Sequence, residues 1–184
     1  MLIIHIISTE DTNDFSEIYA GFENDENTTI LINPIHSVCK KAIIAEKERI
    51  VFIGHGTEWG LLNQRLDGFI VDADMVQFLR GKDIIGIWCY AGNFACRYDL
   101  TGFFTSMFIS NRQELIDNIP DTDYSDEEII HENKNFATRI NKFLHTEIPS
   151  SEWQTILQSE ISKDSPRFVA FNYEAMCSIT ENEI

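Results

Sequence analysis

Two residues whose side chains can do chemistry each follow a run of apolar residues. His55 lies between two glycines, directly after the run IVFI at 50–53, and Cys89 follows the run IIGIW at 84–88. Buried strands favour Val, Ile and Phe, and they tolerate glycine poorly. Glycines on both sides of an ionisable ring therefore indicate a backbone that turns sharply or lies close to another group.

A thiol and an imidazole that face one cleft can perform nucleophilic catalysis. The thiolate attacks a carbonyl carbon, and the imidazole supplies the proton that the leaving amine needs. The amide of Gly56 can donate to the resulting oxyanion, because no side chain blocks its approach. We also expect Cys89 to begin the next helix, whose dipole would favour the thiolate. The alternative is structural, with Cys89 as a small buried apolar residue and His55 as a hydrogen-bonded ring.

The elements that must position these residues alternate between strand-like and helical patterns. Strands are expected at 2–8, 29–33, 49–53, 83–88, 105–110 and 168–172. Helices are expected at 36–48, 75–79, 126–144 and 153–161. The strand runs are almost continuously apolar, which is typical of strands covered on both sides. We therefore predict one α/β domain over residues 1–184, with about six mostly parallel strands and helices on both faces.

The position of His55 and Cys89 at strand ends is informative in such a sheet. Ligands and reactive groups collect beyond the carboxyl ends of parallel strands. A right-handed crossover makes the strands before His55 and Cys89 neighbours, so we expect both side chains in one cleft. Trp88 should point away from the thiol, into the layer between sheet and helix. An indole between the two residues would instead exclude a peptide.

At these strand ends the sequence resembles the caspase-like (clan CD) cysteine peptidases, which include caspases, legumains, gingipains, clostripains and separases. The matching segments are IVFIGHG at 50–56 and IIGIWCYAG at 84–92, and the resemblance covers residues 1–110. It implies a caspase-like strand order and a dyad of Cys89 as nucleophile and His55 as general acid and base. It also implies an oxyanion hole at Gly56 and Cys89, with no metal and no cofactor.

The charge of the chain limits its partners. There are 30 acidic and 14 basic residues, which gives a net charge of −16. This charge repels nucleic acid and anionic membranes, so we expect neither as a partner. It serves solubility, or it steers a basic peptide or protein towards the chain. In a peptidase it favours a basic residue over aspartate before the scissile bond.

The sequence shows no targeting or membrane-spanning signal. The start MLIIHIIS has no preceding basic residues and is too short for a signal-peptide core, and no run approaches the roughly 18 apolar residues of a membrane span. The four cysteines form no CxxC pair, which favours reduced thiols in a cytoplasm over disulfides or a zinc site. We assign Asp67, Asp72 and Asp74 to turns and helix caps rather than to a metal.

These observations together predict a cysteine endopeptidase that acts on a peptide or protein substrate. Two alternatives stay open. One is a catalytically inactive caspase-like domain whose acidic surface binds a basic partner, and the other is an acidic binding protein without cleft chemistry. The sequence does not indicate the oligomeric state.

Overall fold

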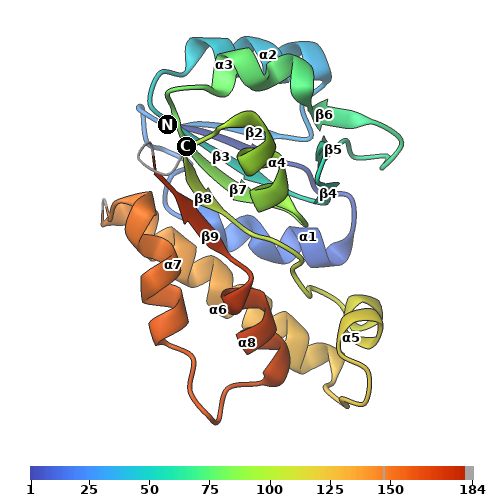
Figure 1. Ribbon diagram of the computed structural model, residues 1–184. Coiled ribbons are helices and arrows are strands. Elements are labelled where there is room, and N and C mark those ends of the chain that lie inside the picture. Colours follow the sequence, from blue (N-terminus) through green and yellow to red (C-terminus); the bar gives the residue numbers. More distant parts are fainter. Residues whose placement is uncertain (147, 181–184) are drawn as a thin grey trace.

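A six-stranded mixed sheet forms the centre of the computed structural model, which describes residues 1–146 and 148–180 (Figure 1). The strand order is β2-β1-β3-β7-β8-β9, in which the first five strands are parallel and β9 is antiparallel. The strands are β1 Leu2–His5, β2 Thr29–Ile32, β3 Arg49–Ile53, β7 Asp83–Ile87, β8 Gly102–Phe104 and β9 Cys177–Ile179. The predicted α/β class with a mostly parallel sheet is confirmed.

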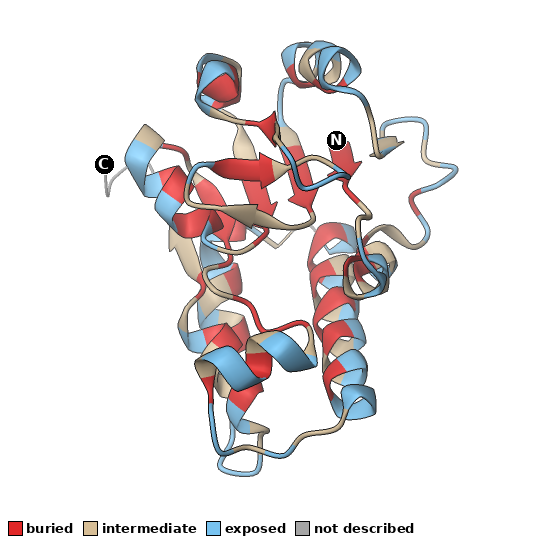
Figure 2. Ribbon diagram, turned by 90° about the vertical axis from the view of Figure 1, so that its right-hand side faces the viewer, coloured by how far each residue is buried: buried red, intermediate tan, exposed pale blue. Residues whose placement is uncertain are grey.

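Helices cover both faces of this sheet (Figure 1). One layer contains α2 His36–Ala45, α3 Val76–Leu79 and α4 Ala91–Tyr98. The opposite layer contains α1 Glu10–Asp14, the 3-10 helix η1 Phe15–Tyr19, α5 Arg112–Asn118, α6 Asp126–His145, α7 Ser150–Ser159 and α8 Arg167–Glu174. In Figure 2 the central strands and the inner sides of the helices are buried, and the outer sides of the helices are exposed.

Alternate strand residues pack into the two layers. Leu2 and Ile4 belong to the apolar cluster under α2 and α4, and Ile3 belongs to the cluster under α6 and α7. Ile53 and Ile87, at the ends of β3 and β7, lie on the same side as Ile3. Both faces of the central strands β1, β3 and β7 are therefore largely apolar, which explains the continuous apolar runs in the sequence.

A second, three-stranded antiparallel sheet follows β3, and the sequence did not predict it. Its strands are β4 Gly56–Thr57, β5 Gly60–Leu62 and β6 Phe69–Val71. The chain then enters a 3-10 helix, η2 Ala73–Met75, and continues directly into α3. The Asp72 side chain caps this start by accepting from the Asp74 N–H, as the sequence predicted.

The predicted strand at 168–172 is wrong, because this segment belongs to α8. Its buried residues follow helical spacing: Phe168, Val169, Asn172 and Tyr173. Pro166 precedes the first turn of the helix, where a proline costs no hydrogen bond. The sixth strand is instead β9, which lies antiparallel to β8 at the edge of the sheet.

The predicted strand at 105–110 is also misplaced, since β8 ends at Phe104. Gly102 begins β8 with a φ of 135°. A Cβ atom at that position would lie 1.9 Å from the carbonyl oxygen of Ile84 in the neighbouring strand, so only glycine fits. A glycine weakens the strand pattern in the sequence, which explains why the strand was predicted after Phe104 rather than at 102–104.

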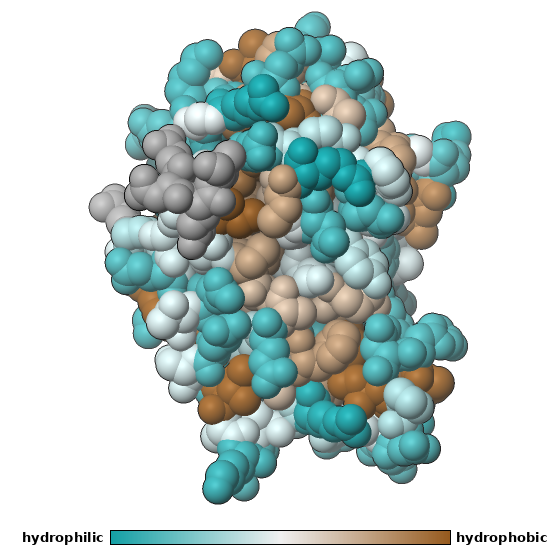
Figure 3. Space-filling model, viewed as in Figure 1, coloured by the Kyte–Doolittle hydropathy of each residue, from teal (hydrophilic) through white to brown (hydrophobic). Residues whose placement is uncertain are grey.

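Polar side chains cover much of the face of the molecule that Figure 3 presents. Figure 3 shows small, separate apolar patches among polar side chains on the face that it presents. In residues 1–146 and 148–180, no helix combines the length and the apolar character needed to cross a membrane.

Candidate functional site

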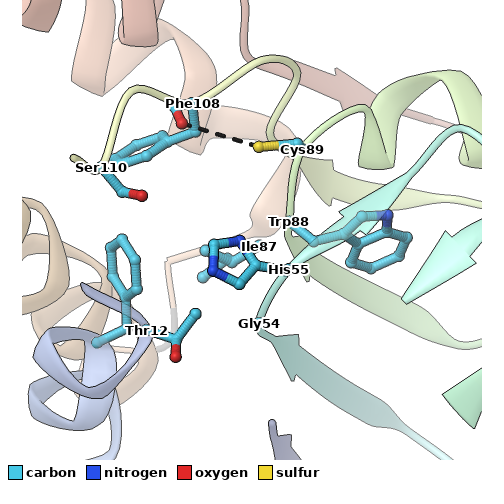
Figure 4. Close-up of a pocket in the computed structure, with 9 residues that line it drawn as sticks. Thr12, Gly54, His55, Ile87, Trp88, Cys89, Phe108 and Ser110 are labelled. Atoms are coloured by element: carbon cyan, nitrogen blue, oxygen red, sulfur yellow. Dashed lines mark hydrogen bonds between the residues drawn. The ribbon is translucent and has the colours of Figure 1, made fainter. Parts of the chain in front are cut away.

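The register of β3 and β7 brings His55 and Cys89 to the same place in the fold. Ile53 pairs with Ile87, and His55 and Cys89 each follow two residues later. The Gly54 N–H still donates to the Ile87 carbonyl at 3.1 Å, so the pairing continues beyond the strands. Because side chains alternate, His55 and Cys89 share the face of the two isoleucines. Both line one pocket at the carboxyl edge of the sheet (Figure 4).

This pocket lies between the ends of the two strands and the segments that follow β1 and β8. Its other lining residues are Thr12, Phe15, Gly54, Ile87, Trp88, Phe108 and Ser110. The cavity volume is about 20 Å³, which is room for about one water molecule. Pockets for small ligands usually measure about 300–1,000 Å³, so this site encloses no peptide segment.

The thiol of Cys89 is protonated in this arrangement. Its S–H donates to the carbonyl of Phe108 at 3.8 Å, the contact drawn in Figure 4. Burial raises the pKa of the thiol to about 12, and the carboxyl groups of Glu114 and Asp11, in their ionised forms, add to the rise. The resting state is therefore a neutral thiol.

The expectation that Cys89 begins a helix is wrong. Helix α4 begins at Ala91, and Tyr90 between them adopts a left-handed conformation with φ 67°. The Tyr90 N–H donates to the carbonyl of Ser106 at 3.1 Å, which fixes this turn. The predicted stabilisation of the thiolate by the helix dipole is therefore absent, in agreement with the raised thiol pKa.

The imidazole of His55 is held from the segment that follows β1. Its Nε2 lies 2.8 Å from the hydroxyl of Thr9 and 3.7 Å from Oδ2 of Asp11. The Asp11 carboxylate raises the pKa of His55 above its ordinary value of 6.5, although burial opposes the rise. No hydrogen bond within the described residues engages Nδ1, so this nitrogen can accept a proton from a thiol.

Asp11 is the centre of a small polar network. Its Oδ2 accepts a hydrogen bond from the hydroxyl of Ser110 at 2.8 Å and one from the side-chain amide of Asn111 at 3.0 Å. Burial acts to raise the pKa of Asp11, but its contact with the His55 imidazole and its hydrogen bonds from Ser110 and Asn111 outweigh burial and hold the pKa well below the ordinary range. Asp11 is therefore ionised behind the imidazole.

Sequence reasoning missed Thr9, Asp11, Ser110 and Glu114. A usable signal was present, because β1 and β8 are parallel to β3 and β7 and end at the same edge of the sheet. Polar residues in the segments after β1 and β8 should therefore meet those after β3 and β7.

Trp88 points away from the thiol, as the sequence predicted. Its indole lies in the opposite layer and is 3% exposed, with ring-edge contacts to Phe52 and Phe94. The indole Nε1–H donates to the Thr57 carbonyl at 3.1 Å. Figure 4 shows the indole turned away from the space between His55 and Cys89. The pocket is therefore not filled by this side chain.

The glycine at position 56 has a packing role that the sequence did not reveal. A Cβ atom there would lie 2.0 Å from Cδ1 of Trp88, so only glycine fits. The Leu62 N–H donates to the His55 carbonyl at 2.9 Å, which makes His55 and Leu62 a hydrogen-bonded pair. Pairs alternate in antiparallel ladders, so the Gly56 N–H points away from β5. This amide can donate to another group.

Across residues 1–146 and 148–180, no group of three or more His, Cys, Asp or Glu side chains is placed to hold a metal ion. Comparison of the chain with models of protein families, with curated proteins and with solved structures gives no match.

Proposed function

We propose that the protein is a cysteine endopeptidase of caspase-like type, with Cys89 as nucleophile and His55 as general acid and base. The observation that supports this most is the shared register of β3 and β7, which puts both side chains on one face and in one pocket. Asp11 behind the imidazole adds a group that stabilises the protonated ring.

Because the resting thiol is neutral, the proposed reaction transfers its proton during attack. The sulfur of Cys89 bonds to the substrate carbonyl carbon while its proton passes to Nδ1 of His55. The Gly56 and Cys89 amides donate to the oxyanion. When the intermediate collapses, the C–N bond breaks and the leaving amine takes the proton from His55. Water then hydrolyses the thioester and restores the thiol.

The proposed substrate is a peptide or protein with a basic residue before the scissile bond. The net charge of −16 attracts such a substrate and repels nucleic acid and anionic lipid. All four cysteines are free, which agrees with a reducing compartment, and we propose the cytoplasm.

A panel of fluorogenic peptides that differ only at the residue before the cut tests this proposal. We expect cleavage after Lys or Arg to exceed cleavage after Asp. Cys89→Ala and His55→Ala should abolish cleavage, and Cys96→Ser is the matched control because Cys96 is exposed on α4. If the correctly folded protein cleaves no peptide in the panel, the peptidase proposal fails.

The second candidate is an inactive domain that binds a basic partner. The raised thiol pKa of about 12 and the small pocket favour it. In that case Cys89→Ala should bind a basic peptide as tightly as wild type, and no peptide should be cleaved.

A further inference from the structure

Ser110 connects two carboxyl groups beside the His55–Cys89 pair. Its hydroxyl oxygen lies 2.8 Å from Oδ2 of Asp11 and 2.9 Å from Oε2 of Glu114. The backbone N–H of Ser110 also donates to Oε2 of Glu114, at 2.8 Å. Ser110 is buried, so water does not separate these groups.

A count of protons shows what this arrangement requires. A serine hydroxyl carries one hydrogen, so it can donate to only one of two carboxylates. If Asp11 and Glu114 were both ionised, one of the two short oxygen–oxygen contacts would have no proton in it. The second contact therefore needs a proton that belongs to one of the carboxyl groups.

Glu114 is the group that fits this role. Asp11 faces the imidazole of His55 and also accepts from Asn111, which favours its ionised form. Glu114 has no cation at a comparable distance among the described residues. Burial raises the pKa of Glu114, and the charge of Asp11 adds to the rise, although the donors of Ser110 oppose it.

We propose that Glu114 is a neutral acid that donates to the Ser110 hydroxyl, which in turn donates to Asp11, and that Glu114 thereby acts as a positioning residue for His55. The role of Glu114 in catalysis rests on the proposed function. The proton shared along these hydrogen bonds does not depend on it. The hydrogen-bonded chain runs from Oε2 of Glu114 through Oγ of Ser110 to Oδ2 of Asp11, with His55 beyond it.

The proton on Glu114 limits the negative charge beside the reactive pair. The ionisable groups that face Glu114 are Asp11, His55 and Cys89. If Glu114 loses its proton, the second negative charge favours the protonated imidazole and the protonated thiol. The Ser110 hydroxyl then also loses one of its two contacts. His55 is then less able to accept a proton, and Cys89 is less able to give one up. The proton on Glu114 therefore keeps the pair reactive.

The experiment is an NMR titration of the full chain that follows the glutamate side-chain carboxyl carbons and the ring of His55. Through-bond correlations to the backbone assign the Glu114 carboxyl carbon in the wild type, and loss of that resonance in Glu114→Gln checks the assignment. We expect its carboxyl carbon to keep the chemical shift of the protonated form after the exposed glutamates have ionised. We expect the chemical shift of the His55 ring, followed against pH, to show a second inflection at the pH where Glu114 ionises.

Three variants make the result specific. Glu114→Gln should remove the second inflection of His55, and Ser110→Ala should reduce it. Asp117→Asn is the control, because Asp117 is an exposed acid on the same helix, α5, and the inflection should be unchanged. If Glu114 ionises together with the exposed glutamates, the inference is wrong. This titration of the wild type decides the question even if a variant fails to fold.

The two proposals can fail separately. If the Glu114 proton is present but no peptide is cleaved, the proposed function fails and this inference stands. If the protein cleaves peptides but Glu114 ionises normally, this inference fails and the peptidase stands. In an active peptidase, Glu114→Gln should also remove one inflection from the pH profile of kcat/KM.

Discussion

The rate of alkylation of Cys89 separates a working dyad from a buried thiol, and the structure sets the size of the difference. With a pKa of about 12, the unassisted thiol is ionised in about one molecule in 10⁵ at pH 7. A free cysteine with a pKa of about 8.5 is about 3% ionised, a difference of about 3,000-fold. The higher nucleophilicity of the more basic thiolate recovers about 25- to 55-fold. Cys89 without help should therefore react about 100-fold more slowly than a free cysteine peptide.

Help from His55 removes this difference, because the proton leaves during attack rather than before it. We expect wild-type Cys89 to react with iodoacetamide at least as fast as the free cysteine peptide at pH 7. His55→Ala should react about 100-fold more slowly, the difference worked out above from the thiol pKa. The measurement is mass spectrometry of the labelled peptide over time. It should use a Cys96→Ser background, because Cys96 is exposed and is labelled without help.

The pH dependence of labelling gives a further check. Asp11 raises the pKa of His55 above 6.5, so the assisted rate should rise with pH as the imidazole passes through this raised pKa and becomes neutral. Asp11→Asn should move this rise to lower pH. If Cys89 reacts about 100-fold more slowly than the free peptide with or without His55, the dyad does not operate and the inactive interpretation is favoured.

Two further predictions concern stability. Gly56→Ala should lower the free energy of unfolding by about 1–3 kcal/mol in denaturant melts, because its Cβ would lie 2.0 Å from Trp88. Gly68→Ala is the control, since its Cβ would meet only the end of the Asn63 side chain at 3.2 Å, and equal losses in both variants would contradict the packing argument. His5 is fully buried, and burial lowers its pKa from 6.5 to about 4. Between pH 6.5 and pH 4, His5 therefore binds a proton in the unfolded chain but not in the folded chain. This difference should lower the free energy of unfolding by up to about 3 kcal/mol as the pH falls from 7 to 4. Denaturant melts of wild type and His5→Gln at both ends of this range measure it, and equal pH dependence would show that His5 is not responsible.

The central strands could be predicted because they are buried on both faces. Such strands leave continuous apolar runs, and the runs ending at Ile53 and Ile87 are long enough to be unambiguous. Parallel neighbours also share one carboxyl edge, so the meeting of His55 and Cys89 followed from strand order alone.

Other elements carried too little pattern. The apolar run at 168–172 fits a short strand as well as a helix. It is helical in the structure, where residues near both ends of α8 are buried. β9 has three half-buried residues, and β4 has two residues, so neither leaves a detectable period. The contact between Gly56 and Trp88 joins segments more than 30 positions apart and has no local signal at all.

The polar side of the site was missed for a different reason, since its residues also serve as helix starts. Thr9 precedes α1 and Asn111 caps α5, where its side chain accepts from the Glu114 N–H. Asp11 and Glu114 lie in the first turns of these two helices, positions that acidic residues commonly occupy for helix stability alone. Both helices begin beyond the carboxyl edge of the sheet, so the caps that fix them also bring their first-turn acids to Ser110, which lines the pocket. The helix-capping residues in the sequence therefore mark the polar residues of the site. Only the strand order shows which of these caps lie near His55 and Cys89.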